Sequence, residues 1–149
     1  MSPEDISVDL LRELFRNLIP WRALFASDGV DVLTCDGISV GLWDLEYLFL
    51  ASQQVLPIRQ RQAIRLCLVQ NMSEQDAAVI MRIDDTNPVA MYATSGLEKL
   101  VHLMRFGLLP SREHVYAEEA RKNSSWKPPK ALGTVSDSEE VYEYCYMEL

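Results

Sequence analysis

Cysteine and histidine are the side chains that most often act as nucleophiles, general bases and metal ligands, and this chain contains three cysteines and two histidines. Cys35, Cys67 and Cys145 are scattered along the sequence, and no two of them have the spacing of a metal site. His102 and His114 have no serine, cysteine or acidic partner at a recognisable spacing. These residues predict neither a catalytic centre nor a metal site, so we expect a protein that is not an enzyme and uses no cofactor.

A group of aspartates between residues 28 and 44 offers oxygen ligands of the kind that a cation needs. Its members are Asp28, Asp31, Asp36 and Asp44. Their spacing fits no calcium loop, and two of them precede a glycine, which is typical of a turn. We therefore interpret the group as turn residues rather than as a cation site.

Contact with DNA is the chemistry that the middle of the chain indicates. Arg59, Arg61 and Arg65 form a basic cluster, and neutralisation of phosphates by Lys and Arg supplies most of the non-specific affinity for DNA. A second group, further along the chain, has mainly uncharged polar side chains of the kind that read base edges. This second group consists of Thr86, Asn87, Met91, Thr94 and Ser95. We predict that both groups bind DNA.

Three predicted helices must position these residues. The first begins near Pro57, because the proline ring fits the start of a helix. The second begins at Ser73, a good N-cap that is followed three residues later by the acidic Asp76. The third opens at Pro88 and carries apolar residues at spacings of three and four. A short helix joined by a turn to a longer one is a helix-turn-helix, which we predict over residues 56–104.

The motifs of this stretch follow one another in a recognisable order. They are Leu56-Pro57, Arg59-Gln60-Arg61, Ile64, Leu66, Ser73, Ala77, Met81, Ile83 and the closing Gly96-Leu97-x-x-Leu100. With these motifs, residues 56–100 resemble region 4 of the sigma-70 family, the part of a bacterial sigma factor that reads the −35 promoter element. The resemblance implies a helix-turn-helix fold, double-stranded DNA as partner and arginines beside the phosphate backbone. It also implies a face that binds RNA polymerase. Short proteins of this type are common in bacteriophages.

Two features of the stretch depart from the sigma-70 pattern. Arg82 stands where the family usually has glycine. Between residues 83 and 97 there is no Lys or Arg, whereas Asp84 and Asp85 precede the predicted recognition helix. This helix therefore offers DNA mainly uncharged side chains.

The composition is that of a soluble globular protein, but the charge is unusual for one that binds DNA. Hydrophobic residues make up 48% of the chain and charged residues 24%. The net charge is −8, whereas DNA-binding domains are usually basic. Residues 1–50 carry three basic and nine acidic side chains, and residues 51–110 carry six basic and five acidic ones. The acidic excess therefore lies outside the predicted helix-turn-helix.

The N-terminal flank predicts two helices. An amphipathic helix opens at Ser2 or Pro3 and is stopped by Pro20. A short helix follows over residues 21–25. The apolar stripe of the first helix indicates packing against the core, with binding of a partner as the alternative.

The remaining flanks predict one small hairpin and further helices. Asp36-Gly37, between two short β-branched runs, is a strong hairpin signal. Helices are expected over residues 42–55 and 112–122. Together these elements predict a mainly α fold, in which residues 1–122 form a single helical domain that contains the helix-turn-helix and one small β-hairpin.

Residues 123–149 read as a linker followed by an acidic, tyrosine-rich, extended tail. Tyr142, Tyr144 and Tyr146 alternate with other residues, as in an extended strand, and we predict that they bind a partner. The partner is the domain itself, a second copy in a homodimer, or another protein; a frayed terminus is the alternative. The five acidic residues within 131–149 could also cover a basic patch and hold DNA off.

Two functions fit these features. The first is a DNA-binding transcription regulator, of the kind found in bacteriophages. The second is a protein-interaction module with the same fold, which binds RNA polymerase or another host protein rather than DNA; the acidic flanks favour it. A third function, that of a phage DNA-packaging subunit, uses similar helix-turn-helix units, and the sequence does not distinguish it from the first two. With no signal peptide and no apolar run near the length of a membrane span, we expect a soluble protein in the cytoplasm of a bacterial host cell, without a membrane partner.

Overall fold

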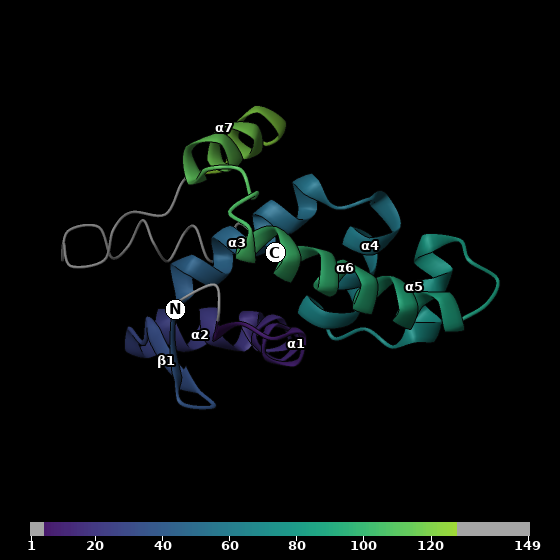
Figure 1. Ribbon diagram of the computed structural model, residues 1–149, viewed down its shortest axis with the longest axis horizontal. Coiled ribbons are helices and arrows are strands. Elements are labelled where there is room, and N and C mark those ends of the chain that lie inside the picture. The colour runs from purple at the N-terminus through teal and green to yellow at the C-terminus, as the bar shows by residue number, and fades with distance from the viewer. Residues whose placement is uncertain (1–4, 128–149) are drawn as a thin grey trace.

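Helices dominate residues 5–127, the part of the chain that the computed structural model describes (Figure 1). The helices are α1 (Val8–Arg16), α2 (Leu18–Asp28), α3 (Leu42–Val55), α4 (Ile58–Ala63), α5 (Glu74–Met81), α6 (Asn87–Arg105) and α7 (Arg112–Lys122). A π-helical segment, η2 (Ile64–Val69), continues α4, and the strands β1 (Val32–Cys35) and β2 (Ile38–Gly41) pair antiparallel. The predicted mainly helical fold with one small hairpin is confirmed. Among the described helices, none has the length and apolarity to span a membrane.

The boundaries of the first two helices differ from the predicted ones. α1 begins at Val8 because the Ser7 hydroxyl caps it, accepting a hydrogen bond from the Leu10 N–H at 3.0 Å. α1 ends before Pro20 is reached. Pro20 lies instead in the first turn of α2, where its missing N–H is not needed. The predicted short helix over residues 21–25 is therefore part of a longer one, and the proline belongs to its start.

The hairpin has the turn that its sequence indicates. Asp36 and Gly37 have φ angles of 52° and 77°, the left-handed values that a two-residue type I′ turn requires. In the antiparallel register, Leu33 lies opposite Val40, which is fully buried. β2 passes directly into α3, whose bounds are those predicted from the sequence. The hairpin is therefore fastened to the helical core at the start of α3.

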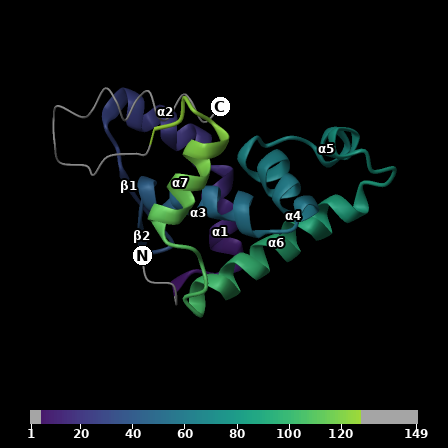
Figure 2. The same cartoon turned by 90° about the horizontal axis from the view of Figure 1, so that it is seen from above.

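The larger hydrophobic cluster surrounds α3, which packs against α1, α2 and α7 (Figure 2). Phe15, Trp21 and Leu45 are among its most buried side chains. The same region encloses an ion pair, in which Arg22 Nε and Nη2 donate to the two carboxylate oxygens of Glu46 at 2.5 and 3.0 Å. The two side chains are 3% and 0% exposed. This buried pair holds α2 and α3 in one relative geometry.

A smaller cluster lies near α5, at the end of the molecule opposite the hairpin (Figures 1 and 2). Its buried members are Ala63, Leu66, Ala77, Ala78, Met81, Val89 and Ala93. The alanines let α5 approach the other helices closely. α6 belongs to both clusters, because Val89 in its first half joins the smaller one and Leu97 and Leu100 in its second half join the larger one.

α6 packs closely against α4 and η2 because Gly96 has no side chain at the contact. A Cβ atom on Gly96 would lie 2.9 Å from Ile64 Cδ1 and 3.2 Å from Gln60 Cβ. Gly96 is buried, and any larger residue there must displace these neighbours. The glycine of the closing Gly-Leu-x-x-Leu motif is thus a packing residue.

Candidate nucleic-acid interface

α5 begins where the sequence predicts it, because Ser73 caps it. The Ser73 hydroxyl accepts a hydrogen bond from the Asp76 N–H at 3.1 Å. The helix ends at Arg82, whose φ of 58° is left-handed and costs an L-residue about 1–2 kcal/mol. This conformation explains why glycine is favoured at such helix ends. After the turn, Asp85 Oδ1 accepts the Asn87 N–H at 3.1 Å and so supports the start of α6.

The predicted base-reading residues lie on the first half of α6. Asn87, Met91 and Ser95 are exposed and recur at intervals of four, so they share one face of the helix. Met91 is 68% exposed. Thr86 is half-buried at the N-cap position. A hollow of about 300 Å³ on this face is lined by Ala90, Met91, Thr94 and Ser95.

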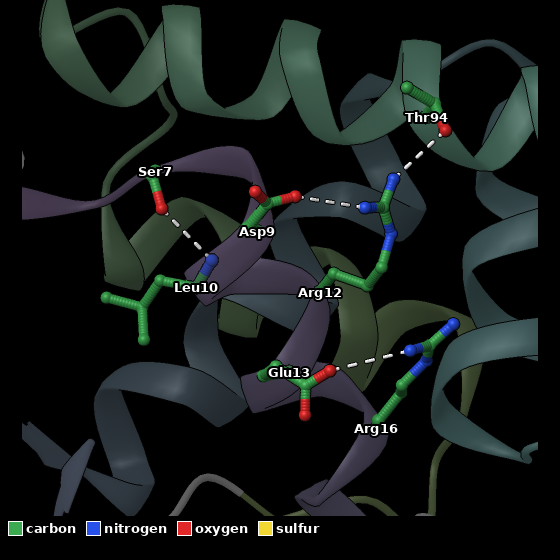
Figure 3. A network of polar contacts seen from close by, with 7 residues as sticks. All are labelled: Ser7, Asp9, Leu10, Arg12, Glu13, Arg16 and Thr94. Carbon is green, nitrogen blue, oxygen red and sulfur yellow. Dashed lines mark hydrogen bonds and ion pairs between the residues drawn. The ribbon is translucent and has the colours of Figure 1, made fainter. Parts of the chain in front are cut away.

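Thr94 differs from the other predicted readers because α1 holds it in place. Arg12 Nη2 donates to Thr94 Oγ1 at 3.0 Å, and Arg12 Nη1 donates to Asp9 Oδ1 at 3.2 Å (Figure 3). One turn further along α1, Arg16 pairs with Glu13 at 3.4 Å. The first half of α6 has no basic residue of its own, and Arg12 of α1 places a positive charge beside it.

Two of the predicted phosphate-binding arginines support the fold instead of pointing freely into solvent. Arg59 donates to the carbonyl oxygen of Met81, at the end of α5. Arg61 Nη1 donates to the Gln53 carbonyl oxygen at 3.2 Å, and Gln53 Nε2 donates to the Arg61 carbonyl oxygen at 3.0 Å. Both arginines are half-buried, whereas Arg65 is exposed. The first two therefore join α4 to α5 and α3.

Arg61 and Arg65 line a hollow of about 430 Å³ between α2, α3, α4, η2 and α7. Its described lining includes the buried Arg22 and one acidic side chain, Glu119, but no residue of α6. The structure therefore does not bring these two arginines together with Met91 or the other predicted readers on α6. The sequence places the arginines and the α6 residues in one motif. In the structure, Arg61 and Arg65 line this hollow, whereas Met91, Thr94 and Ser95 line another one.

Sequence reasoning missed the two arginines that do lie beside α6. Arg12 and Arg16 are on the polar side of an amphipathic helix, which is ordinary for surface residues. Arg12 and Thr94 are 82 residues apart in the chain. Only the packing of α1 against α6 and η2 makes them neighbours, and no local motif carries that information.

Two other side chains with titratable groups, Cys67 and Tyr47, are half-buried. Burial raises the pKa of the Cys67 thiol, and the negative charge of Glu74 raises it further, so the thiol is a poor nucleophile at neutral pH. Burial likewise raises the pKa of Tyr47, although the Arg112 guanidinium beside the ring acts in the opposite direction. Within residues 5–127, no three His, Cys, Asp or Glu side chains come together as a metal site. The aspartates between residues 28 and 44 form no such cluster.

No family model, curated protein or solved structure matches this chain. The resemblance to region 4 of the sigma-70 family therefore rests on its motif residues alone. The predicted partner-binding residues Tyr142, Tyr144 and Tyr146 lie outside the described residues. The candidate interface accordingly consists of the exposed face of α6 together with the two arginines of α1.

Proposed function

We propose that this chain is a transcription regulator that binds double-stranded DNA through a helix-turn-helix formed by α5 and α6. The observation that carries the proposal is the exposed face of α6, where Asn87, Met91 and Ser95 stand on a helix backed by α5. The major groove of B-DNA is about 12 Å wide and admits an α-helix. In this arrangement α6 lies in the groove and α5 crosses the phosphate backbone. The motif resemblance to sigma-70 region 4 supports the same geometry.

The three side chains on this face have complementary uses. The Asn87 amide can donate to and accept from an adenine edge, Met91 offers an apolar surface to a thymine methyl group, and the Ser95 hydroxyl can bond to several bases. Such uncharged contacts give sequence preference, whereas affinity comes mainly from contacts with phosphates. The proposal therefore needs Lys or Arg side chains on the same side of the molecule, outside this face, to contact the phosphates.

A charge placed on the reading face tests the proposal. Met91→Glu should weaken binding roughly tenfold or more, because the carboxylate would face base edges and phosphates without a partner. The measurement is fluorescence polarisation with the best duplex from a random-sequence selection. His102→Glu is the matched control, since His102 is exposed on the second half of the same helix. If both variants bind as the parent protein does, α6 does not lie in the groove.

A protein-interaction module is the second candidate, and one observation favours it. Val79 and Ile80 on α5 are 76% and 52% exposed, and neighbouring exposed apolar side chains are typical of a surface that binds another protein. For this function, the Val79→Lys/Ile80→Lys variant should lose binding to purified bacterial RNA polymerase while Met91→Glu changes no DNA binding. The opposite pattern, with DNA binding lost only in Met91→Glu, supports the first proposal.

A further inference from the structure

A hollow of about 520 Å³ lies where α1, η2, α5 and α6 meet. Arg12 and Arg16 line it from α1, and Ser73 and Glu74 line it from the start of α5. Its α6 side includes Ala90 and Thr94, which also line the smaller hollow on the exposed face of that helix. The two hollows therefore share part of their lining on α6.

The lining of this hollow favours an anion. Arg12 and Arg16 line it, whereas the carboxylates that pair with them, on Asp9 and Glu13, do not. Of the described lining residues, Glu74 alone is acidic. Exposed ion pairs such as Arg16–Glu13 contribute about 0–1 kcal/mol, so a ligand of higher charge density can take over the guanidinium groups. A phosphate has that charge density and matches the planar fork of arginine.

We propose that Arg12 and Arg16 hold a phosphate of the DNA backbone in this hollow while α6 lies in the adjacent major groove. The inference rests on the proposed function, and it assigns to α1 the positive charge that the first half of α6 lacks. It also gives Thr94 a positioning role: its hydroxyl orients Arg12 at the edge of the groove. A helix outside the helix-turn-helix thus supplies the phosphate contacts.

The position of the hollow argues for the DNA backbone rather than for another phosphate. Phosphates line both edges of the major groove, so a site for one must lie beside the helix that enters the groove, at the flank and not on the reading face. The hollow meets this requirement, because it shares Ala90 and Thr94 with the smaller hollow beside Met91 and Ser95 and includes the start of α5. The hollow of Arg61 and Arg65 does not meet it, since no described residue of α6 lines it.

Salt dependence tests the assignment directly. For a short fluorescein-labelled duplex of mixed sequence, the magnitude of the slope of log K against log salt should fall by about 0.9 in the Arg12→Gln/Arg16→Gln variant, because the one phosphate that the two arginines hold is no longer neutralised. Arg121→Gln is the matched control, because Arg121 is exposed and paired with Glu118 three residues away, as Arg16 is with Glu13. Its slope should equal that of the parent protein. Arg12→Lys/Arg16→Lys keeps both charges and should retain the parent slope.

Glu74 provides a test in the direction of tighter binding. Glu74→Gln removes the acidic side chain of the described lining, and the affinity for the same duplex should rise a few-fold at low salt, because one negative charge beside the phosphate is removed. A variant that merely disturbs the fold does not bind more tightly. DNA should also slow alkylation of Cys67, which lines the hollow, and leave the rate at Cys35 on β1 unchanged.

The outcomes separate this inference from the proposed function. If the parent protein does not bind DNA even at low salt, both fail. If it binds, but the Arg12→Gln/Arg16→Gln variant keeps the parent slope, or loses no more than Arg121→Gln, the phosphate site is overturned while DNA binding by α6 stands. A reduced slope with Glu74→Gln binding more tightly supports the assignment. Circular dichroism of each variant checks that it is folded.

Discussion

Replacing Arg22 by methionine should lower the free energy of unfolding by about 3–5 kcal/mol. Glu46 is fully buried, and Arg22 donates to both of its carboxylate oxygens. Methionine has a similar length but no charge, so the variant leaves a carboxylate in a low-dielectric interior without its arginine. Urea-induced unfolding, followed by circular dichroism, measures the loss.

The control removes both charges together. Replacement of a buried ion pair by apolar residues of similar volume is often neutral, so Arg22→Met/Glu46→Leu should recover most of the stability that Arg22→Met loses. A double-mutant cycle then gives the coupling between the two side chains. If Arg22→Met unfolds at the same urea concentration as the parent, the pair is not a determinant of how α2 and α3 pack.

Gly96→Val should destabilise the protein by about 1–3 kcal/mol, the usual cost of overpacking a core. The first added carbon would lie 2.9 Å from Ile64 Cδ1, and the branched side chain needs more room still. Because α6 contributes buried residues to both hydrophobic clusters, a shift of this helix disturbs the packing of both. Thermal unfolding of the purified variant is the measurement.

Ile64 supplies the matching control. Ile64→Val removes Cδ1, the atom nearest to a new Cβ, so Gly96→Ala should be less harmful in that background than in the parent protein. Without the steric conflict, Gly96→Ala should raise the free energy of unfolding by up to about 1 kcal/mol, because alanine has a higher helix propensity than glycine. Equal effects of Gly96→Ala in both backgrounds would show that Ile64 does not limit the approach of the helices.

Local signals account for the parts of the fold that the sequence predicts well. Ser73 caps α5, and Asp36-Gly37 forms the predicted hairpin turn. The helix over residues 42–55 has its predicted bounds. Each of these features depends on a few consecutive residues whose backbone preferences agree with the final structure.

Features that depend on distant contacts could not be predicted in this way. A proline can end one helix or lie in the first turn of the next, and Pro20 does the latter. Arg59 and Arg61 belong to a motif that implies phosphate contacts, yet their direction depends on the carbonyl groups that tertiary packing brings near them. The contact of Arg12 with Thr94 requires two helices to meet whose residues are 82 positions apart in the sequence. Neither periodicity nor spacing encodes such a meeting.

The division of α6 between two clusters has a consequence for local opening of the structure. Its second half is held by Leu97, Leu100 and the rest of the larger cluster, whereas its first half and α5 are held by the smaller cluster, in which four of the seven buried members are alanines. Amide hydrogens of α5 should therefore exchange with solvent through partial unfolding, and those near Leu100 only through global unfolding. The proposed DNA-reading face of α6 lies at the end that we expect to open first. A ligand bound there raises the protection of that end more than that of the hairpin end, because partial opening must then also release the ligand.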